Sequence, residues 1–156
     1  MNIRPDMTIV CATDFSAPSK RALDTAVEVA KRFGASKLLL LHVDETIERF
    51  AAATDAEARF AQEYARLQEE AREATRALAA AATTASGLPV VPEFRTGNAY
   101  LEVVRFAEDV KADLIVVGTH GRTGLKRVIM GSVAERVVRH APCNVLTVKH
   151  DGGSPA

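Results

Sequence analysis

The sequence predicts an α/β fold: a single doubly wound, five-stranded parallel sheet in the order 3-2-1-4-5, with helices on both faces. Five short apolar runs alternate with four helical patterns along the 156 residues, which is the element order of a parallel sheet wrapped by helices. The run at 37–43 is apolar at consecutive positions, as expected for a strand that is covered on both faces. A glycine-rich loop follows the fourth run, at the end of a strand where such sheets bind ligands.

The first strand and the first helix are predicted at the start of the chain. Met7–Ala12 is the short apolar run that predicts the strand. The helix is expected to begin after Ser16, a favoured N-cap residue, with Pro18 in its first turn and Gly34 at its end. The second strand, Lys37–Val43, follows directly.

A long helix is predicted between the second and third strands. Thr54 and Glu57 form a capping box at its start, and Gly87 with Pro89 ends it. Its apolar stripe has spacings of three and four residues, so it is expected to face the core, although the same spacing suits a partner helix. The stripe consists of Phe60, Tyr64, Leu67, Ala71, Ala74 and Leu78.

The second half of the chain supplies three strands and two helices. Val90–Thr96 is the third strand, and Pro92 favours an edge position because proline cannot donate to a ladder. Gly97 and Asn98 open the next helix. The remaining predicted elements are the strand Asp113–Val117, the helix Ser132–His140, which Pro142 stops, and the strand Cys143–Val148.

Length and charge restrict the class of protein. A chain of this size is expected to form one domain, over residues 1–150, and residues 151–156 are expected to be a disordered tail. The 20 basic and 20 acidic residues cancel, which argues against nucleic acid or a membrane surface as a partner because both attract a basic field. No apolar run reaches the ~18 residues of a membrane span, and no signal-peptide pattern begins the chain. A cytoplasmic protein is therefore predicted.

The cysteines and histidines are expected to be structural. Cys11 and Cys143 belong to the first and fifth strands with the fourth between them, a separation of ~9.5 Å that is too long for a disulfide, so both are expected to be packed thiols. The four histidines lack metal-ligand spacing, so no metal site is predicted. His42 is expected to be structural, and His120 to be a surface loop residue in preference to a catalytic base.

The loop between the fourth strand and the last helix carries the clearest functional signal. Glycines at 118, 121, 124 and 131 expose backbone N–H groups next to a helix N-terminus, which attracts anions. The stretch from Gly118 to His140 contains one acid, Glu135, against five basic residues: Arg122, Lys126, Arg127, Arg136 and Arg139. Because strands 1 and 4 are neighbours in the predicted order, Asp14 after the first and Gly118 after the fourth are expected to meet in one crevice. The sequence therefore predicts a site for a phosphate-bearing ligand.

Four segments resemble the universal stress protein family. They are Val10–Ser16, Leu39–Val43, Ala112–Gly124 and Gly131–Cys143, and the resemblance spans Met7 to Lys149. The spacing Gly118-x2-Gly121-x9-Gly131-Ser132 is similar to the signature of the ATP-binding branch of that family.

The resemblance implies a role for each matching position in ATP binding, with Mg²⁺ accompanying the nucleotide. Asp14 and the backbone of Val43 would face the adenine, Ala12 and Thr13 would line its pocket, and Gly118 would lie by the ribose. The phosphates would be held by Gly121, Gly131, Ser132 and Val133, with Arg122 beside them. The resemblance also implies a homodimer formed through the fifth strand, Cys143 to Lys149, which is predicted to lie at an edge of the sheet.

Two departures and three interpretations remain at this stage. Ala134 stands where some ATP-binding members carry a hydroxyl, and Asn144 replaces a proline common in the last strand.

The favoured interpretation is a nucleotide-dependent stress-response regulator, for which slow ATP hydrolysis or self-phosphorylation at Ser132 is conceivable. An adenylyl-transfer or related enzyme is one alternative, although Ala12–Ser16 matches neither of the loops such enzymes carry, and a Walker A loop is absent. A nucleotide-free, dimeric interaction module is the other. Asp14 also has an alternative role, as a cap of the first helix.

Overall fold

A computed structural model describes residues 5–46, 57–120 and 130–149 of the chain. Its sheet is parallel and five-stranded in the order β3-β2-β1-β4-β5, which confirms the predicted fold class and strand order. The strands are β1 (Ile9–Thr13), β2 (Leu38–Asp44), β3 (Val90–Thr96), β4 (Leu114–Gly118) and β5 (Asn144–Val148). The helices are α1 (Ala17–Arg32), α3 (Glu57–Ser86), α4 (Ala99–Asp109) and α5 (Ser132–His140).

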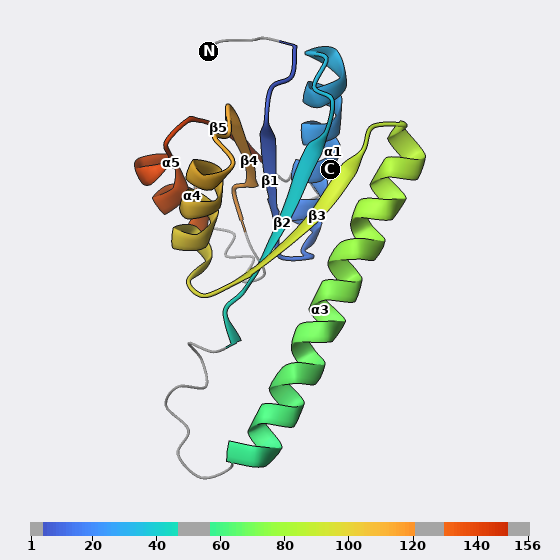
Figure 1. The fold of residues 1–156 in the computed structure, drawn as a ribbon. Helices are drawn as coiled ribbons and strands as arrows, with labels where there is room; N and C mark the ends of the chain where they lie inside the picture. The colour runs from blue at the N-terminus through green and yellow to red at the C-terminus, as the bar shows by residue number, and fades with distance from the viewer. Residues whose placement is uncertain (1–4, 47–56, 121–129, 150–156) are drawn as a thin grey trace, which may run out of the picture.

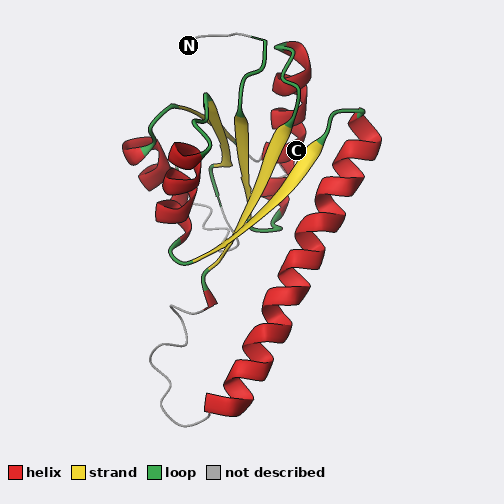
Figure 2. Ribbon diagram, in the orientation of Figure 1, coloured by secondary structure: helices red, strands yellow, loops and turns green. Residues whose placement is uncertain are grey.

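The helices form two layers, one on each face of the sheet (Figure 1, Figure 2). α1 and α3 cover one face, and α4 and α5 cover the other. Consecutive side chains of a strand point to opposite faces, so β1 sends Ile9 and Cys11 into the α1/α3 core and Val10 into the α4/α5 core. All three side chains are fully buried, which explains why the run around them is apolar without interruption.

The helix boundaries follow from local capping. Ser16 is the N-cap of α1, where its side-chain oxygen accepts from the backbone N–H of Ser19. Asn98 caps α4 in the same way by accepting from the backbone N–H of Leu101. Both assignments confirm the predicted helix starts. Thr54 of the predicted capping box, like the predicted tail at 151–156, falls outside the described residues.

One part of the predicted apolar stripe on α3 is wrong. Ala74 is exposed, whereas Thr75 is buried one residue further along. Thr75 can face the core because its hydroxyl donates to the carbonyl of Ala71 at 2.7 Å, so no polar group is buried without a partner. A search for apolar residues alone misses a buried threonine whose hydroxyl is hydrogen-bonded to a carbonyl of its own helix.

The two edges of the sheet differ in protection. At β3, the Thr83 hydroxyl accepts from the N–H of Val90 at 2.9 Å, and Pro92 has no N–H to offer, which confirms its predicted edge position. At β5, Val148 accepts from Thr119 of the neighbouring chain segment at 3.0 Å. Backbone groups alternate in direction along a strand, so Val145 and Thr147 direct theirs away from β4. The β5 edge therefore has main-chain N–H groups directed outward, whereas at the β3 edge that of Val90 is hydrogen-bonded and Pro92 has none.

No helix in the described part of the chain is long and apolar enough to cross a membrane. Both cysteines are free thiols, as predicted, with Cys11 buried and Cys143 partly buried. Burial raises the pKa of the Cys11 thiol to about 12. Burial also raises the pKa of Cys143, and the nearby Asp113 carboxylate adds to that shift. Both thiols are therefore poor nucleophiles at neutral pH.

We expect iodoacetamide to alkylate native protein slowly at pH 8, and Cys11 more slowly than Cys143. With a pKa of about 12, only a fraction on the order of 10⁻⁴ of Cys11 is thiolate at that pH. Peptide mass spectrometry after timed labelling measures both sites, and protein unfolded in urea provides the reference rate. Equal labelling of Cys11 in native and unfolded protein would contradict this account of the core.

Candidate site at the carboxyl ends of β1 and β4

The carboxyl ends of β1 and β4 lie side by side, as the strand order predicts. Their register pairs Ile9 with Leu114 and Cys11 with Val116, so the loops that follow the two strands leave the same edge of the sheet. The backbone N–H of Gly131 donates to the carbonyl of Thr119 at 2.5 Å. This bond holds the start of α5 against the end of β4, and it brings together two parts of the predicted site.

The loop after β1 is held by its own hydrogen bonds. Oδ1 of Asp14 accepts from the backbone N–H of Ser16 at 3.0 Å and from the Ser16 hydroxyl. Ser16 in turn caps α1. Asp14 therefore contributes to the start of α1, which is the capping role that the sequence left open beside ligand recognition.

Thr13 is buried on the α1 side of the loop. The Ser19 hydroxyl donates to the carbonyl of Ser16 at 2.9 Å, so in the 3.2 Å contact between the two hydroxyls the donor is Thr13. The same Thr13 oxygen accepts from the backbone N–H of Phe15 at 3.1 Å. With its hydroxyl engaged in this way, Thr13 tightens the turn between β1 and α1.

His42 joins the loop to β2, a role that the sequence assigned only as structural. Its Nδ1 donates to the carbonyl of Thr13 at 2.9 Å, and its ring is buried between Phe15 and Phe94, with centroid distances of 4.4 Å and 5.6 Å. Phe15 adopts a φ of 64°, which is unusual for an aromatic residue. The ring contact with His42 helps to hold that backbone conformation.

Ala12 and Val43 lie on the other face, where they pack against the α4/α5 core. The register pairs β1 with β2 only as far as Thr13 and His42. Val43 therefore extends beyond the end of β1, at the carboxyl edge of the sheet. Sequence reasoning placed both residues by resemblance, and their shared face agrees with a common surface.

Gly118 meets a steric requirement that the sequence did not reveal. A Cβ built on Gly118 would lie 3.0 Å from both the carbonyl carbon and the oxygen of Pro18, and 3.3 Å from the backbone nitrogen of Ser19. Contacts that short require the backbone of Pro18 and Ser19 to give by a few tenths of an ångström. Glycine thus permits the end of β4 to approach the first turn of α1, whatever contact it makes with a ligand.

The N-terminus of α5 has no side-chain cap. Gly131 is the N-cap residue, in an extended conformation, and as a glycine it has no side chain that could cap the first turn. Ser132 and Val133 are exposed, whereas Ala134 is buried. The first N–H groups of a helix, together with its dipole, attract an oxyanion when no side chain satisfies them.

The predicted basic cluster is only partly within the described residues. Arg139 forms an ion pair with Glu135 at 2.8 Å, and the guanidinium of Arg136 lies 5.2 Å from the Tyr100 ring centroid. Both therefore have partners on the α4/α5 surface. The predicted site residues Gly121 and Arg122 fall outside the described residues, as do Lys126 and Arg127.

The other candidate chemical groups are placed as follows. Nδ1 of His120 lies 3.0 Å from the hydroxyl of Thr119, which is buried at the end of β4. Among the described residues, no group of three or more His, Cys, Asp or Glu side chains is arranged to hold a metal ion.

Comparison with known proteins identifies relatives over almost the whole chain. A family model described as the universal stress protein family matches residues 7–149. Universal stress protein MJ0531 of Methanocaldococcus jannaschii is 40% identical over 141 residues, which cover 90% of this chain and 81% of that protein.

Solved structures share the fold. Universal stress protein UspA from Lactobacillus plantarum superposes with a TM-score of 0.75 at 27% identity, covering 92% of this chain and 98% of that one. A universal stress protein in complex with cAMP superposes with a TM-score of 0.64 at 28% identity, covering 93% and 98% of the two chains.

We expect Gly118→Ala to lower the free energy of unfolding by about 1–3 kcal/mol, because the new methyl group overpacks a backbone contact. The backbone amide resonance of Ser19 should shift as the first turn of α1 moves. Gly87→Ala is the comparison variant: a Cβ there meets nothing within 4 Å, so it should lower stability through its positive φ alone and leave the Ser19 resonance unshifted. Urea denaturation and amide spectra measure both effects, and an unshifted Ser19 with unchanged stability would disprove the steric role.

Proposed function

Since the chain belongs to the universal stress protein family, we propose that it is a cytoplasmic stress-response protein that binds ATP with Mg²⁺ and acts as a nucleotide-dependent switch. The observation that carries the proposal is the N-terminus of α5, whose N-cap residue is a glycine with no capping side chain and is hydrogen-bonded to the end of β4. A helix terminus of this kind at the carboxyl edge of a parallel sheet suits a phosphate group.

The phosphates would be held mainly by backbone groups. The N–H groups of Ser132 and Val133 are at the start of α5, and the exposed Ser132 hydroxyl adds one donor. Gly121 and Arg122, from the loop between β4 and α5, would complete this part of the site. Mg²⁺ would arrive with the triphosphate and offset its charge, because hard cations prefer oxygen ligands.

The base would lie towards β1 and β2. Ala12 and Val43 share the face of the sheet that α4 and α5 cover, and the backbone of Val43 extends past the end of β1. Asp14 would accept a hydrogen bond from the exocyclic amino group of adenine while Oδ1 continues to hold Ser16. The relative solved in complex with cAMP supports an adenine nucleotide as the ligand class.

The same family membership supports a homodimer through β5. Val145 and Thr147 direct backbone groups to the open edge, and the β5 segment from Cys143 to Lys149 carries one charged residue, Lys149. The opposite edge is closed by Thr83 and Pro92. An antiparallel pairing of two β5 strands about a two-fold axis would cover the unprotected edge.

We expect wild-type protein to bind ATP more tightly than GTP, and Gly131→Val to abolish binding of both. Gly131 has a φ of −68° and a ψ of 158°, which valine adopts readily, so the variant should fold while its side chain occupies the phosphate path. Isothermal titration calorimetry with Mg²⁺ present measures the affinities. Ser132→Ala is the control, and it should retain weaker binding because it removes a single hydroxyl.

Equal affinity for ATP and GTP would remove Asp14 from base recognition, because the keto oxygen of guanine would face its carboxylate at a cost of about 1–3 kcal/mol. Unchanged ATP affinity in a folded Gly131→Val variant would refute the phosphate site at α5.

We expect Thr147→Pro to convert the dimer into a monomer, because it removes a main-chain donor that points to the open edge. Thr147→Ala is the matched control, since it keeps the N–H group and should remain dimeric. Proline at Leu146 would be a poor test, because Leu146 shares the backbone direction of Val148 and bonds inward to β4. Sedimentation at micromolar concentration reports the mass, and a monomeric wild type or a folded dimeric Thr147→Pro would contradict this interface.

A further inference from the structure

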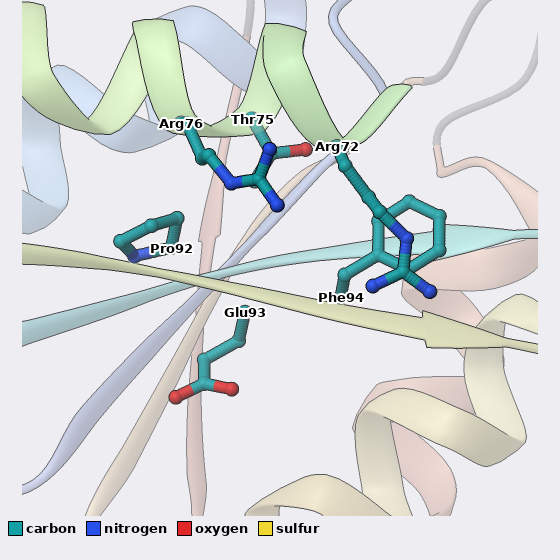
Figure 3. Close-up of a pocket in the computed structure, with 6 residues that line it drawn as sticks. All are labelled: Arg72, Thr75, Arg76, Pro92, Glu93 and Phe94. Carbon is teal, nitrogen blue, oxygen red and sulfur yellow. The ribbon is translucent and has the colours of Figure 1, made fainter. Parts of the chain in front are cut away.

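A cavity of about 250 Å³ lies between α3 and β3, on the opposite side of the sheet from Ala12 and Val43 (Figure 3). Its lining residues are Arg72, Thr75, Arg76, Pro92, Glu93 and Phe94. The two arginines extend from α3 towards β3, whereas the Glu93 carboxylate extends from the far side of β3 (Figure 3). The side of the cavity that faces α3 therefore presents two guanidinium groups, of which that of Arg76 is ion-paired through one nitrogen with Glu69 and Glu73. The cavity is separate from the proposed nucleotide site.

Arg72 differs from the neighbouring arginines of α3 in its partners. Arg66 pairs with Glu63 and Glu70 at 2.5 Å and 2.7 Å, and Arg76 pairs with Glu69 and Glu73 at 3.2 Å each. These pairs use the four nearest glutamates of the helix. Within the described residues, no carboxylate lies within 4.0 Å of the Arg72 guanidinium, although its side chain is partly buried.

The Phe94 ring holds the Arg72 guanidinium at the cavity. The central carbon of the guanidinium lies 4.4 Å from the ring centroid, which is a favourable cation–π distance. Stacking uses the face of the guanidinium and leaves the N–H donors at its edge available. Such an edge matches the two oxygens of a carboxylate or a phosphoryl group.

The edge of β3 is unsuited to a peptide partner, since Thr83 bonds the N–H of Val90 and Pro92 lacks a donor. A strand added here would find few main-chain partners. The volume of the cavity also favours a small ligand, because pockets for cofactors and drug-sized molecules occupy ~300–1,000 Å³.

We propose that the cavity between α3 and β3 is a binding site for a small oxyanion, a carboxylate or a phosphate, with Arg72 as its main partner and Arg76 as a second donor. Phe94 also contacts the His42 ring, which contacts Phe15 in the loop after β1. The site therefore adjoins a continuous row of ring contacts that ends at the loop carrying Asp14.

Titration of the isotope-labelled full chain with inorganic phosphate and, separately, with succinate tests the proposal by amide NMR. We expect saturable shifts at Arg72, Arg76 and Phe94 with at least one of the two probes, and the tighter probe identifies the anion class. Sodium chloride at matched ionic strength is the control for screening. Arg72→Gln should weaken binding about tenfold or more, and Arg76→Gln about threefold, because charge-assisted hydrogen bonds are lost.

Arg66→Gln is the matched variant, because it removes an exposed arginine of the same helix that does not line the cavity. It should leave the affinity unchanged. The proposal is overturned if neither probe gives saturable shifts at the cavity, if sodium chloride reproduces them, or if Arg72→Gln binds as wild type does. Shifts confined to Gly131–Val133 would overturn it as well, while leaving the nucleotide proposal intact.

Discussion

The close approach of β4 to the first turn of α1 determines the geometry of the rest of the site. β1 pairs with β4 at the centre of the sheet, and Gly118 brings the end of β4 to within contact distance of the Pro18 backbone. The loops that carry Asp14 and Thr119 therefore begin next to each other. The hydrogen bond from Gly131 to Thr119 then fixes the start of α5 at the same place. The close packing that Gly118 permits therefore positions the loops after β1 and β4 and the start of α5, which together form the proposed site.

The loop after β1 is ordered before any ligand arrives. Asp14 accepts from Ser16, and Ser16 and Thr13 each bond to Ser19 in the first turn of α1. His42 donates to Thr13 and so joins the loop to β2. Such an arrangement reduces the conformational entropy that a ligand must otherwise remove on binding. Asp14 therefore stabilises the start of α1 through Ser16, in addition to its proposed role in recognition of the base. Substitutions at Asp14 will therefore affect the stability of α1 together with any affinity.

The sequence predicted the elements that have a strong local signal. Apolar runs, N-caps and breakers predicted the described strands and helices to within two residues of their observed bounds, apart from the predicted start of α3 at Thr54, which falls outside the described residues. The topological argument predicted the strand order. The packing role of Gly118 could not be predicted from the sequence, because a side chain there would clash with the backbone of Pro18, one hundred residues earlier in the chain. The row of ring contacts formed by Phe15, His42, Phe94 and Arg72 was missed for the same reason, since its members come from four separate segments.

The prediction that Ala74 faces the core was wrong, because the buried position is occupied by Thr75, whose hydroxyl is hydrogen-bonded to the carbonyl of Ala71. The candidate site was predicted from glycine spacing and family resemblance, and the structure adds the glycine N-cap of α5 as a physical basis for the proposed anion binding. The difference between the two sheet edges likewise became apparent only with the backbone directions, because alternate residues of β5 face inward and outward.

Native mass spectrometry of freshly purified protein tests the central claim most directly, since it reports bound nucleotide and oligomeric state in one spectrum. The account predicts a dimer that carries an adenine nucleotide, or that gains one per chain when ATP and Mg²⁺ are added. A chain that stays free of nucleotide under both conditions would contradict it.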